Sequence, residues 1–71
     1  MQTLPAFPNR SLLSRRQLEV TGCLVHGLTN KEIARKMEIS PRTVEDYRFQ
    51  VLRKLGVRNT IELTRFVYQL N

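Results

Sequence analysis

The sequence predicts an all-α fold of four helices joined by short loops. Strong helix-start signals stand at Ser14, Thr29 and Ser40, whose side chains can each cap a helix N-terminus. Gly27 and Gly56 follow the first and third predicted helices, and glycine commonly ends a helix in the left-handed conformation. No stretch alternates apolar and polar residues as a half-buried strand does. These observations favour helices throughout the folded part of the chain.

The chain has 71 residues, the length of one small domain with a limited core. Its first twelve residues include Pro5 and Pro8 and show neither helical nor strand periodicity. We therefore expect a flexible tail or linker at residues 1–12 and a folded domain at residues 13–71.

The first helix is predicted over residues 15–26. Ser14 precedes Gln17 by three residues, which is the spacing of a capping box. In that motif each side chain accepts a hydrogen bond from the other residue's backbone N–H. Gly27 then ends the helix.

The second and third helices are predicted over residues 30–37 and 41–55. Thr29 and Glu32 repeat the capping box at the start of the second helix. Pro41 takes the first position of the third helix, where its missing N–H costs nothing. A short helix, a tight turn and a longer helix are typical of a helix-turn-helix.

The fourth helix is predicted over residues 60–70, with a weaker start signal from Asn59 and Glu62. One side of this helix is apolar and carries Leu63, Phe66, Val67 and Leu70. We expect contact with a second copy of the chain through Leu63, Val67 and Leu70. The alternative, in which the whole stripe belongs to the core, stays open.

The charge of the chain favours a polyanionic partner. Twelve Lys and Arg face six Asp and Glu, and the pI is about 10.5. Nucleic acid ranks ahead of a membrane surface, although a merely basic soluble protein has the same balance.

The sequence offers little to a metal, a cofactor or a catalytic site. A single cysteine, Cys23, and a single histidine, His26, exclude an internal disulfide and a cysteine-based zinc site. No nucleophile–base pair, carboxylate pair or phosphate loop has a recognisable spacing, so we expect no enzyme. No apolar run reaches the length of a membrane span and no signal peptide is visible, so the cytoplasm is the expected compartment.

The third predicted helix has two distinct sides when its residues are placed about 100° apart. We expect the side with Val44, Arg48, Val51 and Leu55 to face the core. The opposite side carries Arg42, Asp46, Phe49, Gln50 and Arg53, with Glu45 on its flank. A guanidinium group can bind guanine or phosphate, and an amide can bind adenine. A carboxylate can accept from the cytosine amino group, and an aromatic ring can contact the thymine methyl group. We interpret this side as a DNA-reading face; an ordinary solvated face is the alternative.

Phosphate contacts are expected from the edges of this face and from the start of the second helix. The candidates from charge and position are Asn30, Lys31, Arg42, Thr43, Arg53, Lys54 and Arg58. Such contacts set affinity and salt dependence and carry little sequence preference.

Three spaced stretches carry a family resemblance: LSRRQLEV, GLTNKEIARKMEISPRTVE and VLRKLGVRNTIEL. Across residues 13–70 they resemble the LuxR/GerE-type helix-turn-helix family. The pieces SPRTVE and YR are most similar to the branch found as output domains of FixJ-like response regulators.

The resemblance implies a four-helix DNA-binding domain whose third helix enters the major groove. It implies a fourth helix that mediates dimerisation on two-fold symmetric sites. The implied base contacts are Glu45, Asp46 and Phe49, with Gln50 beside them. The implied backbone contacts lie near Asn30, Lys31, Thr43 and Lys54. The chain departs from the family at Tyr47, where histidine is usual, at Gln17, where glutamate is usual, and at Thr21, where leucine is frequent.

The sequence therefore predicts a transcription regulator that binds double-stranded DNA as a dimer, at least on DNA. RNA polymerase is a further candidate partner, and the bacterial nucleoid is the expected location. Two alternatives stay open: a domain like region four of a sigma factor, and an anti-activator module that binds protein and has lost DNA binding. The adjacent acids Glu45 and Asp46 are the main support for the module. They also raise a narrower question: whether Asp46 reads a base or orients Arg42, four residues away.

Overall fold

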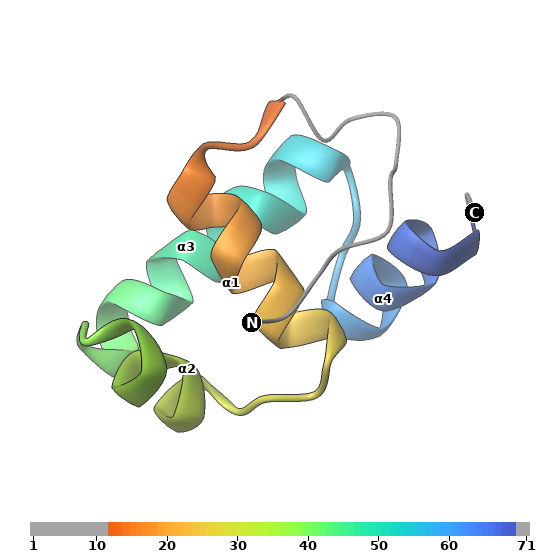
Figure 1. The fold of residues 1–71 in the computed structure, drawn as a ribbon. Helices are drawn as coiled ribbons and strands as arrows, with labels where there is room; N and C mark the ends of the chain where they lie inside the picture. The colour runs from red at the N-terminus through yellow and green to blue at the C-terminus, as the bar shows by residue number, and fades with distance from the viewer. Residues whose placement is uncertain (1–11, 70–71) are drawn as a thin grey trace.

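The computed structural model describes residues 12–69, which form four helices in the order expected (Figure 1). The helices are α1 (Arg15–Val25), α2 (Asn30–Met37), α3 (Pro41–Leu55) and α4 (Thr60–Gln69). No strand occurs within residues 12–69, so the all-α prediction is confirmed. The predicted tail at residues 1–12 lies almost wholly outside the described part, and so does Leu70.

The helix starts follow the predicted side-chain caps. The Ser14 hydroxyl accepts from the Gln17 backbone N–H at 3.2 Å, and the Gln17 side chain accepts from the Ser14 N–H at 2.9 Å. Thr29 and Glu32 form the same reciprocal pair at the start of α2. Each capping residue of this kind contributes about 1 kcal/mol, because it satisfies an N–H that the helix leaves unpaired.

Two of the helix ends are as expected, and one is not. Gly56 caps α3 with φ at 71°, and Gly27 follows the C-cap of α1 with φ at 86°. Helix α1 ends at Val25, with His26 as its C-cap, one residue earlier than predicted. The unexpected end is that of α2, where Glu38 takes the left-handed conformation with φ at 58°.

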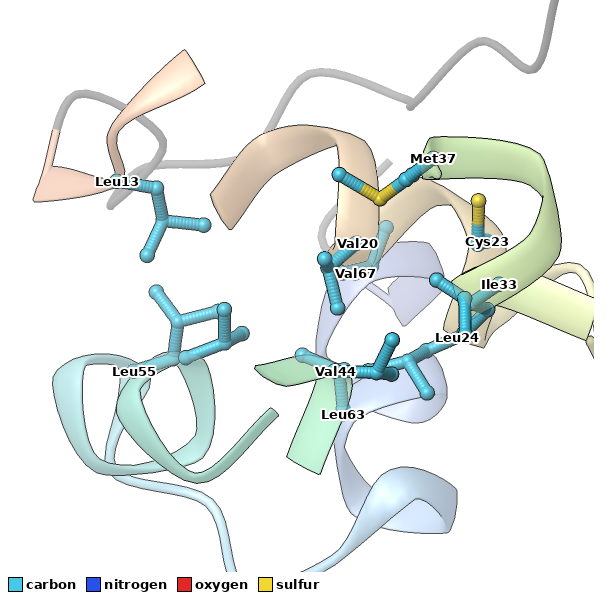
Figure 2. Close-up of a cluster of buried hydrophobic side chains, with 12 residues drawn as sticks. Leu13, Val20, Cys23, Leu24, Ile33, Met37, Val44, Leu55, Leu63 and Val67 are labelled. Carbon is cyan, nitrogen blue, oxygen red and sulfur yellow. The ribbon is translucent and has the colours of Figure 1, made fainter. Parts of the chain in front are cut away.

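The core lies between α1, α3 and α4, with α2 packed against α3. Val20, Val44 and Val51 are fully buried, as are Ile33 and Leu63. Figure 2 shows the buried side chains converging from all four helices.

The predicted inner side of α3 is largely confirmed, with one correction. Val44, Val51 and Leu55 are buried, but Arg48 is half-buried and not part of the core. An Nη of its guanidinium reaches outward to the Glu45 Oε1 at 3.1 Å, while the Nε is buried and has no hydrogen-bond partner among residues 12–69.

Candidate nucleic-acid interface

The outward side of α3 is exposed along its length. Arg42, Asp46, Phe49, Gln50 and Arg53 are all exposed, and Glu45 on the flank is exposed too. Phe49 is 61% exposed, a large apolar surface for a side chain on an otherwise polar face. The core side of the same helix holds the face in place.

Both acids on this face pair with arginines of the same helix. The Arg42 Nε lies 3.5 Å from the Asp46 Oδ1, and an Arg48 Nη lies 3.1 Å from the Glu45 Oε1. The structure therefore pairs Arg42 with Asp46, the residue four positions along α3. Exposed pairs of this kind contribute between about 0 and 1 kcal/mol to stability. Either pair can therefore break at small cost, which leaves the carboxylate for a base and the arginine for a phosphate.

An aromatic ring and a cation stack beside these acids. The Arg53 guanidinium carbon lies 5.6 Å from the centroid of the Phe49 ring, within the range of a cation–π contact. The two residues line a shallow hollow of about 230 Å³ together with Gln50 and Lys54. The hollow lies on the exposed face of α3, where an edge of a base or a methyl group can enter it.

A buried glutamine on α1 binds two candidate DNA-contacting residues. Gln17 is 6% exposed, and its Nε2 donates to the Gln50 Oε1 at 2.9 Å. The Lys54 Nζ donates to the Gln17 Oε1 at 3.0 Å and to the Leu12 carbonyl at 3.2 Å. The amide of Gln50 is thus half committed to α1, and Lys54 keeps one of its three donors for another acceptor.

Sequence reasoning missed this role of Gln17. The sequence predicts a capping-box role for Gln17 and marks it as a departure from the usual glutamate, and its Oε1 does accept from the Ser14 N–H as the motif requires. The partners on α3 lie 33 and 37 residues away in sequence. The sequence carries no signal for these partners, because the burial of the amide, which requires partners beyond its own helix, is seen only in the fold.

The phosphate candidates differ in exposure and in whether another side chain already binds them. Lys31 is exposed and Asn30 half-buried at the start of α2, while the Thr43 hydroxyl is 2.9 Å from the Ser40 hydroxyl. Arg58 is bound by Glu62, with an Arg58 Nη 2.8 Å from the Glu62 Oε2. The hydrogen bonds from Arg58 hold the pKa of the Glu62 carboxyl below its usual range, because they stabilise the charged form.

The predicted contact surface on α4 needs a correction. Leu63 and Val67 are fully buried inside the single chain, so neither has surface left for a second copy. Leu70 lies outside the described residues. The exposed apolar side chains of α4 are instead Ile61, at 73%, and Tyr68, at 46%.

Two further features, a metal-binding cluster and a membrane-spanning helix, are absent from the described residues. Within residues 12–69 no three His, Cys, Asp or Glu side chains gather where they could hold a metal ion. No helix there is long and apolar enough to cross a membrane. Cys23 is buried at 3% exposure, and this burial raises the pKa of its thiol.

Comparison with protein families gives one match that covers most of the chain. The model of bacterial regulatory proteins of the luxR family matches residues 11–67. Similar curated proteins include the transcriptional regulatory protein FixJ of Azorhizobium caulinodans, 51% identical over 53 residues, which are 75% of this chain and 25% of that protein. FixJ of Bradyrhizobium diazoefficiens is 47% identical over 53 residues, covering 75% of this chain and 26% of that protein.

A third relative comes from a different bacterium, and a solved structure agrees with the fold. The oxygen regulatory protein NreC of Staphylococcus aureus is 38% identical over 55 residues, 78% of this chain and 25% of that protein. The crystal structure of full-length FixJ from B. japonicum matches with a TM-score of 0.77 and 41% identity, covering 89% of this chain and 32% of that one. The chain thus spans about a quarter of the length of these curated relatives.

Proposed function

Because the chain belongs to the luxR family of bacterial regulatory proteins, we propose that it regulates transcription by reading the major groove of double-stranded DNA with α3. The observation that carries this proposal is the exposed face of α3, on which arginines, carboxylates, an amide and Phe49 stand together. An α-helix fits the major groove, where each of these groups has a partner on a base edge.

Base reading and backbone binding fall to different residues in this proposal. Base edges are read by Glu45, Asp46, Phe49 and Gln50. Phosphates are bound by Asn30, Lys31, Arg42, Thr43, Arg53, Lys54 and Arg58. The positive charge at the edges supplies affinity, which leaves the middle of the helix free to discriminate between bases.

We further propose that two copies bind two half-sites related by two-fold symmetry. Ile61 and Tyr68 lie seven residues apart, about two helical turns, and so share one side of α4. An isologous contact through this side would set two α3 helices about 34–36 Å apart, one turn of DNA. Contact with RNA polymerase and a location at the nucleoid follow from such a role and stay predictions.

The alternative of a protein-binding module loses its main support. The acids that suggested it are both paired with arginines of α3, so they do not form an unbalanced acidic surface. A module of that kind would keep the same fold, so an experiment must separate the two functions.

Selection of bound duplexes from a random pool tests the proposed function directly. We expect the 71-residue chain to enrich a short motif, repeated with two-fold symmetry in the longer selected duplexes. Enrichment of no motif, with equal binding to every duplex, would contradict sequence-specific reading. Absence of any duplex binding at low salt would favour the protein-binding module.

A further inference from the structure

The orientation of the buried Gln17 amide is fixed by its neighbours. Its Oε1 accepts from the Ser14 backbone N–H at 2.9 Å and from the Lys54 Nζ at 3.0 Å. Both groups can only donate, so the atom between them must be the oxygen of the amide. The Nε2 is therefore the atom that faces Gln50, at 2.9 Å from its Oε1.

This orientation determines which half of the Gln50 amide is free. A donor on Gln17 requires an acceptor on Gln50, so the Oε1 of Gln50 is turned toward α1. Among the contacts within residues 12–69, none is a hydrogen bond from the Gln50 Nε2. Gln50 is exposed and shares the outward stripe of α3 with Asp46, Phe49 and Arg53, at spacings that bring helical neighbours together.

We propose that Gln17 is a positioning residue that makes Gln50 a hydrogen-bond donor toward DNA. A free glutamine amide pairs with adenine through one donor and one acceptor, whereas Gln50 presents only its NH₂ group. Guanine, through O6 and N7, and thymine, through O4, offer acceptors in the major groove and are then favoured. Adenine is less favoured, because its one acceptor, N7, lies beside its own amino group. Cytosine, which presents an amino group, is rejected. This inference rests on the proposed function, because it specifies one position within the proposed reading face.

The variant Gln17→Glu tests the inference with almost no change in shape. The carboxylate still accepts from the Ser14 N–H and from Lys54, and glutamate is a standard partner in a capping box. Its second oxygen can only accept, so Gln50 must turn its NH₂ group inward and its oxygen outward. Gln50 then presents an acceptor to the groove, which favours the amino group of cytosine or adenine.

The measurement is the base preference at the position that depends on Gln50. Duplex selection is run with the unmodified chain, with Gln17→Glu, and with Gln50→Ala in both backgrounds. The position is the one at which Gln50→Ala removes the preference. We expect guanine or thymine there for the unmodified chain and cytosine or adenine for Gln17→Glu. Titration of matched duplexes should show a change of roughly tenfold in the affinity ratio.

The affinity ratio separates positioning from a merely structural role. The added negative charge of Gln17→Glu weakens binding to all duplexes alike, so it does not alter a ratio between two of them. In the Gln50→Ala background, Gln17→Glu should leave the ratio unchanged, because the group that it turns is absent. Thermal unfolding followed by circular dichroism checks that each variant is folded.

Two results would overturn the inference while leaving the proposed function intact. One is selection of the same base by the unmodified chain and by Gln17→Glu, both folded and both enriching a motif. The other is a shift that persists in the Gln50→Ala background. Failure of the unmodified chain to enrich any motif would instead count against the proposed function itself.

Discussion

Glu38 carries backbone strain at the turn between α2 and α3. Its φ of 58° lies in the left-handed region, where the Cβ of a non-glycine residue crowds its own backbone. The described part of the chain has two other residues at positive φ, Gly27 and Gly56, and glycine takes this conformation without strain. The turn of the helix-turn-helix is therefore closed by a residue poorly suited to its conformation.

Replacing Glu38 by glycine should stabilise the domain by about 1 kcal/mol, because it removes the Cβ that causes the strain. For a domain of this size that gain raises Tm by roughly 4–8 °C. Gly56→Ala is the matched control: it introduces a Cβ at φ 71° and should lower Tm. Circular dichroism melting checks both, and an unchanged or lower Tm for Glu38→Gly would contradict the strain.

Asp46 could read a base or orient Arg42, and the distance between the two side chains does not decide between these roles. The pair is exposed and its atoms are 3.5 Å apart, so it is easily exchanged for contacts to DNA. We expect Asp46→Ala to change base preference at one or two positions, by removing an acceptor for a cytosine amino group.

A double-mutant cycle separates the two roles of Asp46. If Asp46 acts by orienting Arg42, its loss should have no effect on base preference once Arg42 is alanine. If it reads a base, the change persists in that background. The same motif from the unmodified chain and from Asp46→Ala would exclude it as a reader.

At the scale of the element, the role proposed for α3 combines charge at its edges with discrimination between bases in its middle. Lys31 on α2 and Arg53 on α3 are the clearest phosphate candidates, since both are exposed and neither forms an ion pair among the described residues. Their proposed contacts supply affinity that does not depend on sequence.

Lys31→Ala and Arg53→Ala should each weaken binding to all duplexes and lower the slope of log affinity against log salt by about 1. Arg65→Ala on α4 removes the same charge from an exposed position away from α2 and α3, and it is the matched control for binding to a single half-site. Salt titrations on a single half-site supply the slopes. Unchanged slopes for both variants would remove these residues from the backbone contacts.

The start of α4 is tied down by the ion pair between Arg58 and Glu62. The pKa of Glu62 is lowered in the folded chain, so the unfolded chain takes up a proton first as pH falls. The stability that the pair contributes is therefore present at neutral pH. It is lost as pH falls from the ordinary pKa of glutamate, about 4.3, through the lower folded value.

Arg58→Ala should consequently lower Tm at pH 7 and make little difference well below pH 4. Melting curves across this range, with the variant compared to the unmodified chain at each pH, isolate the pair from other carboxyl groups. In a Glu62→Gln background the effect of Arg58→Ala should not vary with pH. A difference in Tm that stays constant down to acid pH would contradict the linkage.

The start signals, the two glycine stops and the inner face of α3 could be predicted because each depends on neighbours close in sequence. Glu38 was missed because no glycine marks its conformation, and Gln17 because its partners on α3 are distant in sequence. The contact with a second copy expected for Leu63 and Val67 is wrong for another reason. Helical periodicity shows which residues share a side, but it does not show whether that side meets the core or a second molecule.

At the scale of the whole molecule, the proposed contact with a second copy is assigned to the exposed apolar side chains of α4. Ile61 and Tyr68 are exposed on one side of the helix, while Leu63 and Val67 hold the other side to the core. The proposed assembly on paired half-sites therefore depends on the first two side chains, and the fold of each copy on the second two.

Ile61→Asp should reduce cooperative binding to paired half-sites and leave affinity for a single half-site nearly unchanged. An acid is tolerated in the first turn of a helix, so this variant should fold. Val67→Asp is the contrasting variant: it buries a charge in the core and should abolish binding to both kinds of site by unfolding the chain. Equal loss on both sites for Ile61→Asp would argue against the α4 contact.

The burial of Cys23 makes the rate at which its thiol is alkylated a measure of how often this small domain opens. The thiol is shielded within the core and its raised pKa keeps it protonated, so a reagent that attacks thiolates must wait for α1 to open. The rate of alkylation then depends on how often the domain opens as well as on the intrinsic reactivity of the thiol. A chain bound to a duplex would open less often, so its Cys23 would be alkylated more slowly. The alkylation rate of this thiol would therefore report whether DNA is bound.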